Sequence, residues 1–86
     1  MKLKELTENN IKLLFEISEK GYVTKRTQKT YISGLGFYMA IWTLRDMGLV
    51  FENGVDDRRQ KKWFLTKKGK KIAEYLRKIE EEFENG

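Results

Sequence analysis

The sequence contains no cysteine, no histidine and no proline. Without cysteine the chain cannot form a disulfide, a thiolate zinc site or a cysteine nucleophile. The lack of histidine removes the commonest base and metal ligand at neutral pH. No apolar run approaches membrane-spanning length, and the first residues show no apolar segment typical of a signal peptide. We therefore expect a cytoplasmic protein that has no membrane segment and no cofactor.

The 86 residues suffice for one small domain with a modest core, and 40% of them are hydrophobic, which is enough to fold. The net charge is +5, and it is unevenly distributed. Cations concentrate over residues 56–71 and 20–31, whereas the segment from Glu74 onward is net acidic. A basic middle and an acidic end indicate two surfaces with different roles.

Capping residues and hydrophobic periodicity predict a helix near the start of the chain. Thr7 is a good N-cap for a helix that runs to about Lys20, and Gly21 is well placed to end it. Its apolar residues are Ile11, Leu13, Leu14, Phe15 and Ile17. A stub of strand is expected at 22–24.

Two further helices are expected to follow. Thr24 can cap a second helix over roughly 25–33, and a turn over 33–36 has two glycines free to adopt positive φ. A third helix is expected from about Gly36 to Met47, ending at Gly48. Its core face comprises Phe37, Ala40, Ile41, Leu44 and Met47, and its opposite face comprises Tyr38, Met39, Trp42 and Asp46.

The second half of the chain reads as a hairpin followed by a helix. Strands are expected at 49–52 and 61–65, with Asn53-Gly54 beginning a basic connection. On the return strand Lys61, Trp63 and Leu65 should face one side and Lys62 and Phe64 the other. Thr66 can cap a last helix over about 67–83.

This order, α-β-α-α-β-β-α, is that of a winged helix-turn-helix module. The expected fold class is therefore α+β, mostly α, in a single domain over 1–86. The wing should cover about 49–66, and the C-terminal helix at about 67–83 should serve dimerisation.

Two motifs carry a family resemblance. Asp57-Arg58-Arg59, followed by Leu65-Thr66-x-x-Gly69, resembles the wing of the MarR-type winged-helix family. Leu44-x-x-Met47-Gly48-Leu49-Val50 resembles the end of that family's recognition helix and the start of its wing. The match covers about residues 21–76.

The resemblance implies a short, single-domain member of a family of DNA-binding proteins that are commonly homodimers and often repressors. It implies that the third helix lies in the major groove and that Arg59 reaches the minor groove or its phosphates. It further implies that Asp57 orients basic groups in the wing.

A DNA surface would combine phosphate contacts from the wing and the second helix with base contacts from the third helix. The alternative is that the charged segments are only solvated. The expected contact residues are Lys25, Arg26, Lys29, Ser33, Tyr38, Met39, Trp42, Thr43, Arg58, Arg59, Lys61 and Lys62.

The outer face of the third helix is unusual for a base reader, because it lacks the Arg, Lys, Asn or Gln that usually reads base edges. Tyr38 and Thr43 can form hydrogen bonds, and Met39 and Trp42 can touch thymine methyl groups. Alternatively, Tyr38 and Trp42 pack on the wing or on another protein.

The last helix carries Ile72, Leu76, Ile79 and Phe83 at intervals of four, three and four, which is the spacing of a two-stranded seam. Tyr75 broadens this stripe. Ile72 and Leu76 should pack on the core, and the rest should form a twofold homodimer interface. The alternative is a helix that folds wholly onto its own core.

No nucleophile–base pair, glycine-rich phosphate loop or metal constellation supports an enzyme. We therefore predict a non-enzymatic, dimeric protein that prefers certain double-stranded DNA sequences, a transcriptional regulator with a roughly palindromic operator. The alternatives are a winged-helix protein-interaction module and a sequence-indifferent architectural DNA binder. The sequence identifies no small-molecule effector.

Overall fold

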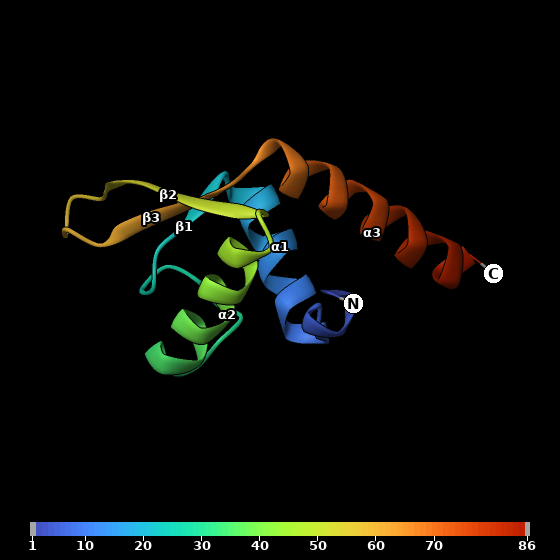
Figure 1. Ribbon diagram of the computed structural model, residues 1–86, viewed down its shortest axis with the longest axis horizontal. Helices are drawn as coiled ribbons and strands as arrows, with labels where there is room; N and C mark the ends of the chain where they lie inside the picture. The colour runs from blue at the N-terminus through green and yellow to red at the C-terminus, as the bar shows by residue number, and fades with distance from the viewer. Residues whose placement is uncertain (1, 86) are drawn as a thin grey trace.

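A computed structural model describes residues 2–85 of the chain. The elements in chain order are the 3-10 helix η1 (Lys2–Glu5), α1 (Glu8–Lys20), β1 (Tyr22–Val23), α2 (Gly34–Asp46), β2 (Val50–Val55), β3 (Lys61–Leu65) and α3 (Lys67–Asn85). The strands form an antiparallel sheet in the order β1-β3-β2 (Figure 1). The predicted winged-helix class is confirmed, with α2 as the predicted third helix.

Local capping accounts for the helix ends. The Thr7 hydroxyl accepts a hydrogen bond from the Asn10 amide at the start of α1, and Gly21 ends that helix with a φ of 91°. Ser33 caps α2 in the same way by accepting from the Gly36 amide, and Gly48 follows its end with a φ of 77°. The predicted ends of these helices hold to within about two residues.

The predicted helix over 25–33 is wrong, because the chain makes only one turn there and then runs as an irregular loop. Thr24 does cap this turn, since its hydroxyl accepts from the Thr27 amide at 3.1 Å. A continuing helix would direct the Lys29 amide to the Lys25 carbonyl. That amide instead donates to the Glu16 carboxylate, at 2.8 and 3.1 Å to its two oxygens.

Further side chains hold the loop in its irregular form. The buried Gln28 amide group exchanges two hydrogen bonds with the backbone of Tyr31, each 2.7 Å long. The Tyr31 hydroxyl donates to Asn10 of α1 at 2.6 Å. These bonds satisfy polar groups that a second helix would have satisfied internally.

The two glycines near the start of α2 also differ from expectation. Gly34 and Gly36 lie in its first turn and neither has a positive φ. They lie close to neighbouring side chains instead. A Cβ at Gly34 would lie 3.1 Å from Cδ of Lys25, and one at Gly36 would lie 3.0 Å from the Ser33 hydroxyl.

The first strand of the wing is longer than predicted. Asn53 and Gly54 were expected in the connection, but β2 continues through them to Val55. The pairing of β2 with β3 changes register between Glu52 and Val55, so β2 carries one extra residue there. Gly54 accommodates this β-bulge with a φ of 74°. The connection is therefore reduced to residues 56–60.

The core lies between α1, α2, the sheet and the start of α3. It contains Leu13, Leu14, Ile17, Val23, Phe37, Ala40, Ile41, Leu44, Met47, Leu49, Val50, Trp63, Leu65 and Ala73. The predicted core face of α2 is confirmed, because all five of its residues belong to this core. The predicted alternation of β3 is confirmed as well, because Trp63 and Leu65 are buried. Phe64 lies on the other sheet face between Tyr22 and Phe51, with ring centroids 5.5 and 5.7 Å away.

The Leu65-Thr66-x-x-Gly69 motif forms the junction between the wing and α3. The Thr66 hydroxyl donates to the Gly48 carbonyl at 2.6 Å and accepts from the Gly69 amide at 2.9 Å. The Thr66 amide donates to the Leu49 carbonyl at 2.9 Å. One threonine therefore ties the end of α2, the wing and the start of α3 together.

Candidate nucleic-acid interface

The wing tip is a five-residue turn organised by Asp56. Its carboxylate accepts from the amides of Arg58 and Gln60 at 2.9 and 2.8 Å, and its carbonyl accepts from the Arg59 amide at 3.0 Å. The resemblance pointed to Asp57 for an orienting role, but no hydrogen bond or ion pair joins the exposed Asp57 carboxylate to another residue within 2–85. The acidic residue that shapes the tip is thus its neighbour.

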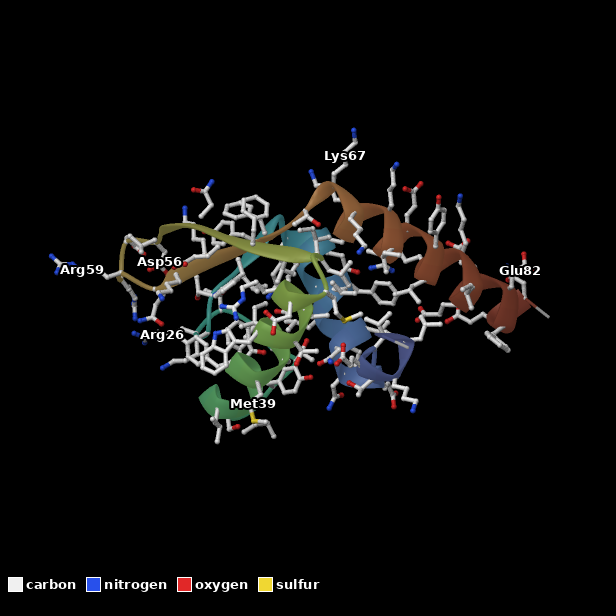
Figure 2. All side chains as sticks on the ribbon, viewed as in Figure 1. Arg26, Met39, Asp56, Arg59, Lys67 and Glu82 are labelled. Atoms are coloured by element: carbon white, nitrogen blue, oxygen red, sulfur yellow. The ribbon has the colours of Figure 1, made fainter. Side chains whose placement is uncertain are left out.

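Arg59 occupies the outermost point of the wing (Figure 2). Its φ is 62°, in the left-handed region that disfavours residues with a side chain. Such strain costs about 1–3 kcal/mol and persists where the surrounding structure enforces it. The three hydrogen bonds of the Asp56 turn enforce it here, and they aim the Arg59 side chain away from the body of the protein.

The structure divides the predicted phosphate-binding cations into two groups. Lys61 pairs with Glu52 at 3.6 Å, and the Lys62 ammonium lies 4.7 Å from the centre of the Tyr22 ring. In contrast, no ion pair within residues 2–85 engages Lys25, Arg26, Lys29, Arg58 or Arg59, all of which are exposed. The second group keeps its full charge available to an external anion.

These available cations lie toward one end of the molecule. In Figure 2 Arg26, Arg59 and the wing tip occupy the same end as the exposed side of α2, where Met39 is labelled. Glu82 lies at the opposite end, on α3, and Lys67 projects from the side away from α2. The uneven charge of the sequence therefore becomes a basic end and an acidic end.

The loop that carries Lys25, Arg26 and Lys29 is anchored by Glu16 of α1. This carboxylate accepts from the Lys20 ammonium at 2.6 Å and the Thr30 hydroxyl at 2.8 Å, in addition to the Lys29 amide. Burial raises the pKa of Glu16, but the hydrogen bonds from Lys20, Thr30 and Lys29 outweigh it, so the pKa is lowered overall. Lys29 consequently lies beside α1, and its backbone is engaged there.

The start of α2 brings a cation and backbone donors together. Ser33 uses its hydroxyl as the helix cap, and the Lys25 stem lies against Gly34. The first amides of a helix carry partial positive charge and suit a phosphate. Ser33 and Lys25 therefore occupy a position from which a backbone phosphate could be held.

The outer face of α2 is exposed and largely apolar. Met39 and Trp42 are exposed as expected, and Leu35 and Ile32 extend the same surface toward the loop. Tyr38 is half-buried against Trp42, with ring centroids 5.5 Å apart. Leu35 and Ile32 were not among the predicted contact residues. Their signal was the helical spacing of Leu35, Met39 and Trp42 once α2 is extended to Gly34.

The Thr43 hydroxyl and the two charged residues at the end of α2 are engaged within the protein. The Thr43 hydroxyl donates to the Met39 carbonyl at 2.9 Å, which occupies its single proton. Arg45 pairs with the adjacent Asp46 at 3.2 Å. The predicted polar contribution of Thr43 to base reading is thus limited to accepting a hydrogen bond.

A second apolar surface lies on α3. Ile72 and Leu76 are half-buried against the core as predicted, whereas Tyr75, Ile79 and Phe83 are 56%, 54% and 83% exposed. Arg77, on the other flank, pairs with Glu19 and lies over the Phe15 ring at 4.4 Å. The helix is therefore held to α1 by one flank and leaves an apolar stripe uncovered on the other.

This protein is a winged-helix protein. Its sheet has the strand order β1-β3-β2, its β2–β3 hairpin forms the wing, and the exposed helix α2 precedes that wing. Its fold is the MarR-type winged helix, as solved structures show. No family model matches the sequence, and no curated protein matches it significantly. No helix within residues 2–85 is long and apolar enough to cross a membrane.

Three of the similar structures illustrate the match. MepR, a transcription regulator of the Staphylococcus aureus multidrug efflux pump MepA, is 22% identical with a TM-score of 0.80 over 92% of this chain. A MarR-family transcriptional regulator from Silicibacter pomeroyi is 23% identical with a TM-score of 0.81 over 94%. A MarR-family regulator from Neisseria meningitidis is 26% identical with a TM-score of 0.73 over 96%. The chain spans 61%, 56% and 61% of their respective lengths.

Proposed function

We propose that this protein is a non-enzymatic, DNA-binding transcription regulator of the cytoplasm, with residues 1–86 as one winged-helix domain. The observation that carries the proposal is the position of Lys25, Arg26, Arg58 and Arg59, none of which has an ion-pair partner within residues 2–85. Lys25 packs against the start of α2, and Arg26 and the wing tip lie toward the same end as the exposed face of α2. A duplex is the polyanion that such an arrangement suits. The similarity to solved transcription regulators supports the same reading.

In this proposal α2 enters the major groove and the loop and wing flank it. Lys25, Arg26 and the start of α2 hold phosphates on one side, and Lys29, Lys61 and Lys62 add to the positive field. Arg58 contacts phosphates beyond the groove. Arg59 reaches into the adjacent minor groove, where a narrow groove attracts a guanidinium group.

We further propose that the protein acts as a twofold dimer through α3. The exposed Tyr75, Ile79 and Phe83 lie next to the half-buried Ile72 and Leu76 and form a stripe long enough for a helix-to-helix contact. A dimer would present two α2 helices to half-sites about 34 Å apart, which is one turn of DNA, and would favour a palindromic operator.

The test is selection of bound duplexes from a random pool, followed by competition against bulk DNA at two salt concentrations. A regulator should prefer one duplex, whereas an architectural binder should not. Four cations per protomer that displace counterions from the duplex, namely Lys25, Arg26, Arg58 and Arg59, predict that log K falls with log salt with a slope of about −3.6 per protomer. Binding without preference would refute the regulator, and no binding at low salt would refute DNA binding altogether.

A charge-matched pair of variants tests the location of the interface. Arg58→Gln with Arg59→Gln should reduce the slope by about 1.8 per protomer. Lys67 projects from the side away from α2 in Figure 2, and Lys71 follows it by four residues on the same helix face. Lys67→Gln with Lys71→Gln therefore removes the same charge outside the proposed interface and should change the slope little. Equal effects of the two double variants would show that general charge, rather than the wing, governs binding.

A protein-interaction module is the second candidate, and the exposed Leu35, Met39 and Trp42 favour it. It predicts weak DNA affinity even at low salt. Trp42→Ala provides the matching test, because unchanged operator preference together with lost assembly would remove Trp42 from base reading.

A further inference from the structure

The reading face of α2 is uncharged. Between Ser33 and Leu44 the sequence has no Lys, Arg, Asp or Glu and no Asn or Gln. The side chains that project from this stretch are instead Leu35, Met39 and Trp42, which are 70%, 60% and 44% exposed. The residue types that usually pair with purine edges in the major groove are therefore missing from this part of the helix.

These three side chains follow one line along the helix, because they are spaced four and three residues apart. At a rise of about 1.5 Å per residue, the line from Leu35 to Trp42 is about 10 Å long. That length matches about three base-pair steps of roughly 3.4 Å each. One face of α2 can therefore meet several successive base pairs with apolar atoms.

The major groove of DNA presents one apolar group, the 5-methyl group of thymine. We propose that Leu35, Met39 and Trp42 select DNA by packing on thymine methyl groups, so that the preferred site is rich in thymine where α2 lies. This inference rests on the proposed DNA binding and specifies how the site is read. Discrimination then comes from buried apolar area rather than from hydrogen bonds to base edges.

The surroundings of the apolar line favour a duplex over a protein as its occupant. The rim carries Lys25 and Arg26 in the loop and Arg58 and Arg59 in the wing, none of which has an ion-pair partner within residues 2–85. Asp46, the acid at the far end of α2, is paired with Arg45 at 3.2 Å. An apolar strip with a cationic rim complements a groove that has methyl groups on its floor and phosphates along both edges.

The experiment uses the best duplex from selection and replaces thymine by deoxyuridine, one position at a time. This substitution removes only the methyl group and keeps the base pairing. At each position that α2 contacts, the replacement should weaken binding about fourfold, which corresponds to about 0.8 kcal/mol for one buried methyl group. Positions outside the α2 footprint should show no change.

Two variants connect the effect to the helix. In Met39→Ala the penalty for deoxyuridine at one or two positions should fall below about twofold, because the partner of the methyl group is shortened. Leu3→Ala is the control, since Leu3 is 66% exposed on η1 and lies outside the proposed surface. It should leave the penalties unchanged.

Methylated cytosine supplies a second readout. A cytosine placed at a sensitive position should bind more tightly when it carries a 5-methyl group, because that group occupies the place of the thymine methyl. If the parent duplex binds and neither deoxyuridine nor 5-methylcytosine changes the affinity, methyl reading is refuted and DNA binding stands. If no duplex binds, the proposed function fails, and methyl reading fails with it.

Discussion

Replacing Gly69 by alanine should destabilise this protein, although the same change within a helix usually adds up to about 1 kcal/mol of stability. A Cβ built at Gly69 would lie 2.0 Å from the Leu49 carbonyl oxygen and 2.9 Å from its carbon. Both obstacles are backbone atoms, and the Thr66 amide donates to the same carbonyl at 2.9 Å. Neither the wing nor α3 can therefore move aside without breaking the junction between them.

The size of the effect follows from these contacts. Overpacking of this kind costs about 3 kcal/mol, and the gain in helix propensity offsets about 1 kcal/mol, which leaves a net loss of about 2 kcal/mol. For a domain of this size that loss lowers Tm by about 8–16 °C. Thermal unfolding followed by circular dichroism measures it directly.

Gly34→Ala is the matched control, because Gly34 also lies in the first turn of a helix. Its added Cβ would meet Cδ of Lys25 at 3.1 Å, and that flexible stem can move. The control should change Tm by only a few degrees. A Gly69→Ala protein as stable as the parent would refute the argument that the Thr66 junction is rigid.

Three further predictions concern the loop, the wing and α3. Glu16→Gln should lower the free energy of unfolding by about 1–2 kcal/mol at pH 7. The folded pKa of Glu16 lies below its ordinary value of 4.5, so the stability that its carboxylate contributes is present above that pH and is lost as the pH falls through the folded pKa. The unfolding free energies of parent and variant from urea titrations should therefore converge in acid, and a difference that stays constant with pH would contradict this. Arg59→Gly should stabilise the protein by about 0.5–1 kcal/mol by relieving the φ of 62°, yet weaken DNA binding, and a loss of both would show that the tip is unstrained. Ile79→Ser with Phe83→Ser should yield a monomer in sedimentation without loss of helicity, and a parent protein that is already monomeric at micromolar concentration would exclude the dimer.

Much of the fold could be predicted because its signals are local. Thr7 and Thr66 cap helices through bonds to amides three residues away, and Gly21 and Gly48 end helices through their own φ. The burial of Trp63 and Leu65 follows from the alternation of a strand. Such features need no knowledge of distant residues.

The predictions of local structure that failed concern segments whose conformation is decided by distant residues. Residues 25–33 have a helix cap and reasonable helix formers, but Glu16 draws the Lys29 amide away from the helix, 13 residues along the chain. Likewise, the bulge at Gly54 depends on the register of β3, and the choice of Asp56 over Asp57 at the tip depends on how the hairpin closes. A prediction made from one segment at a time cannot take these distant interactions into account.

The candidate site shows the same division. The cations, Met39 and Trp42 could be named in advance, whereas Leu35 and Ile32 were missed, and the contact of all these residues with DNA stays a prediction. Which cations are already engaged was decided by tertiary packing, since Lys61 meets Glu52 across the hairpin and Lys62 meets Tyr22 of β1.

By itself, the amino-acid sequence determined where α1, α2 and α3 begin and end, which residues of α2 and β3 face the core and which segments carry charge, because caps, periodicity and composition act over a few residues. Only the tertiary structure decided that the available cations and the uncharged face of α2 lie together at one end, with the acidic part of α3 at the other. That arrangement depends on the sheet and the Thr66 junction, which join segments far apart in the chain, and no local pattern contains it.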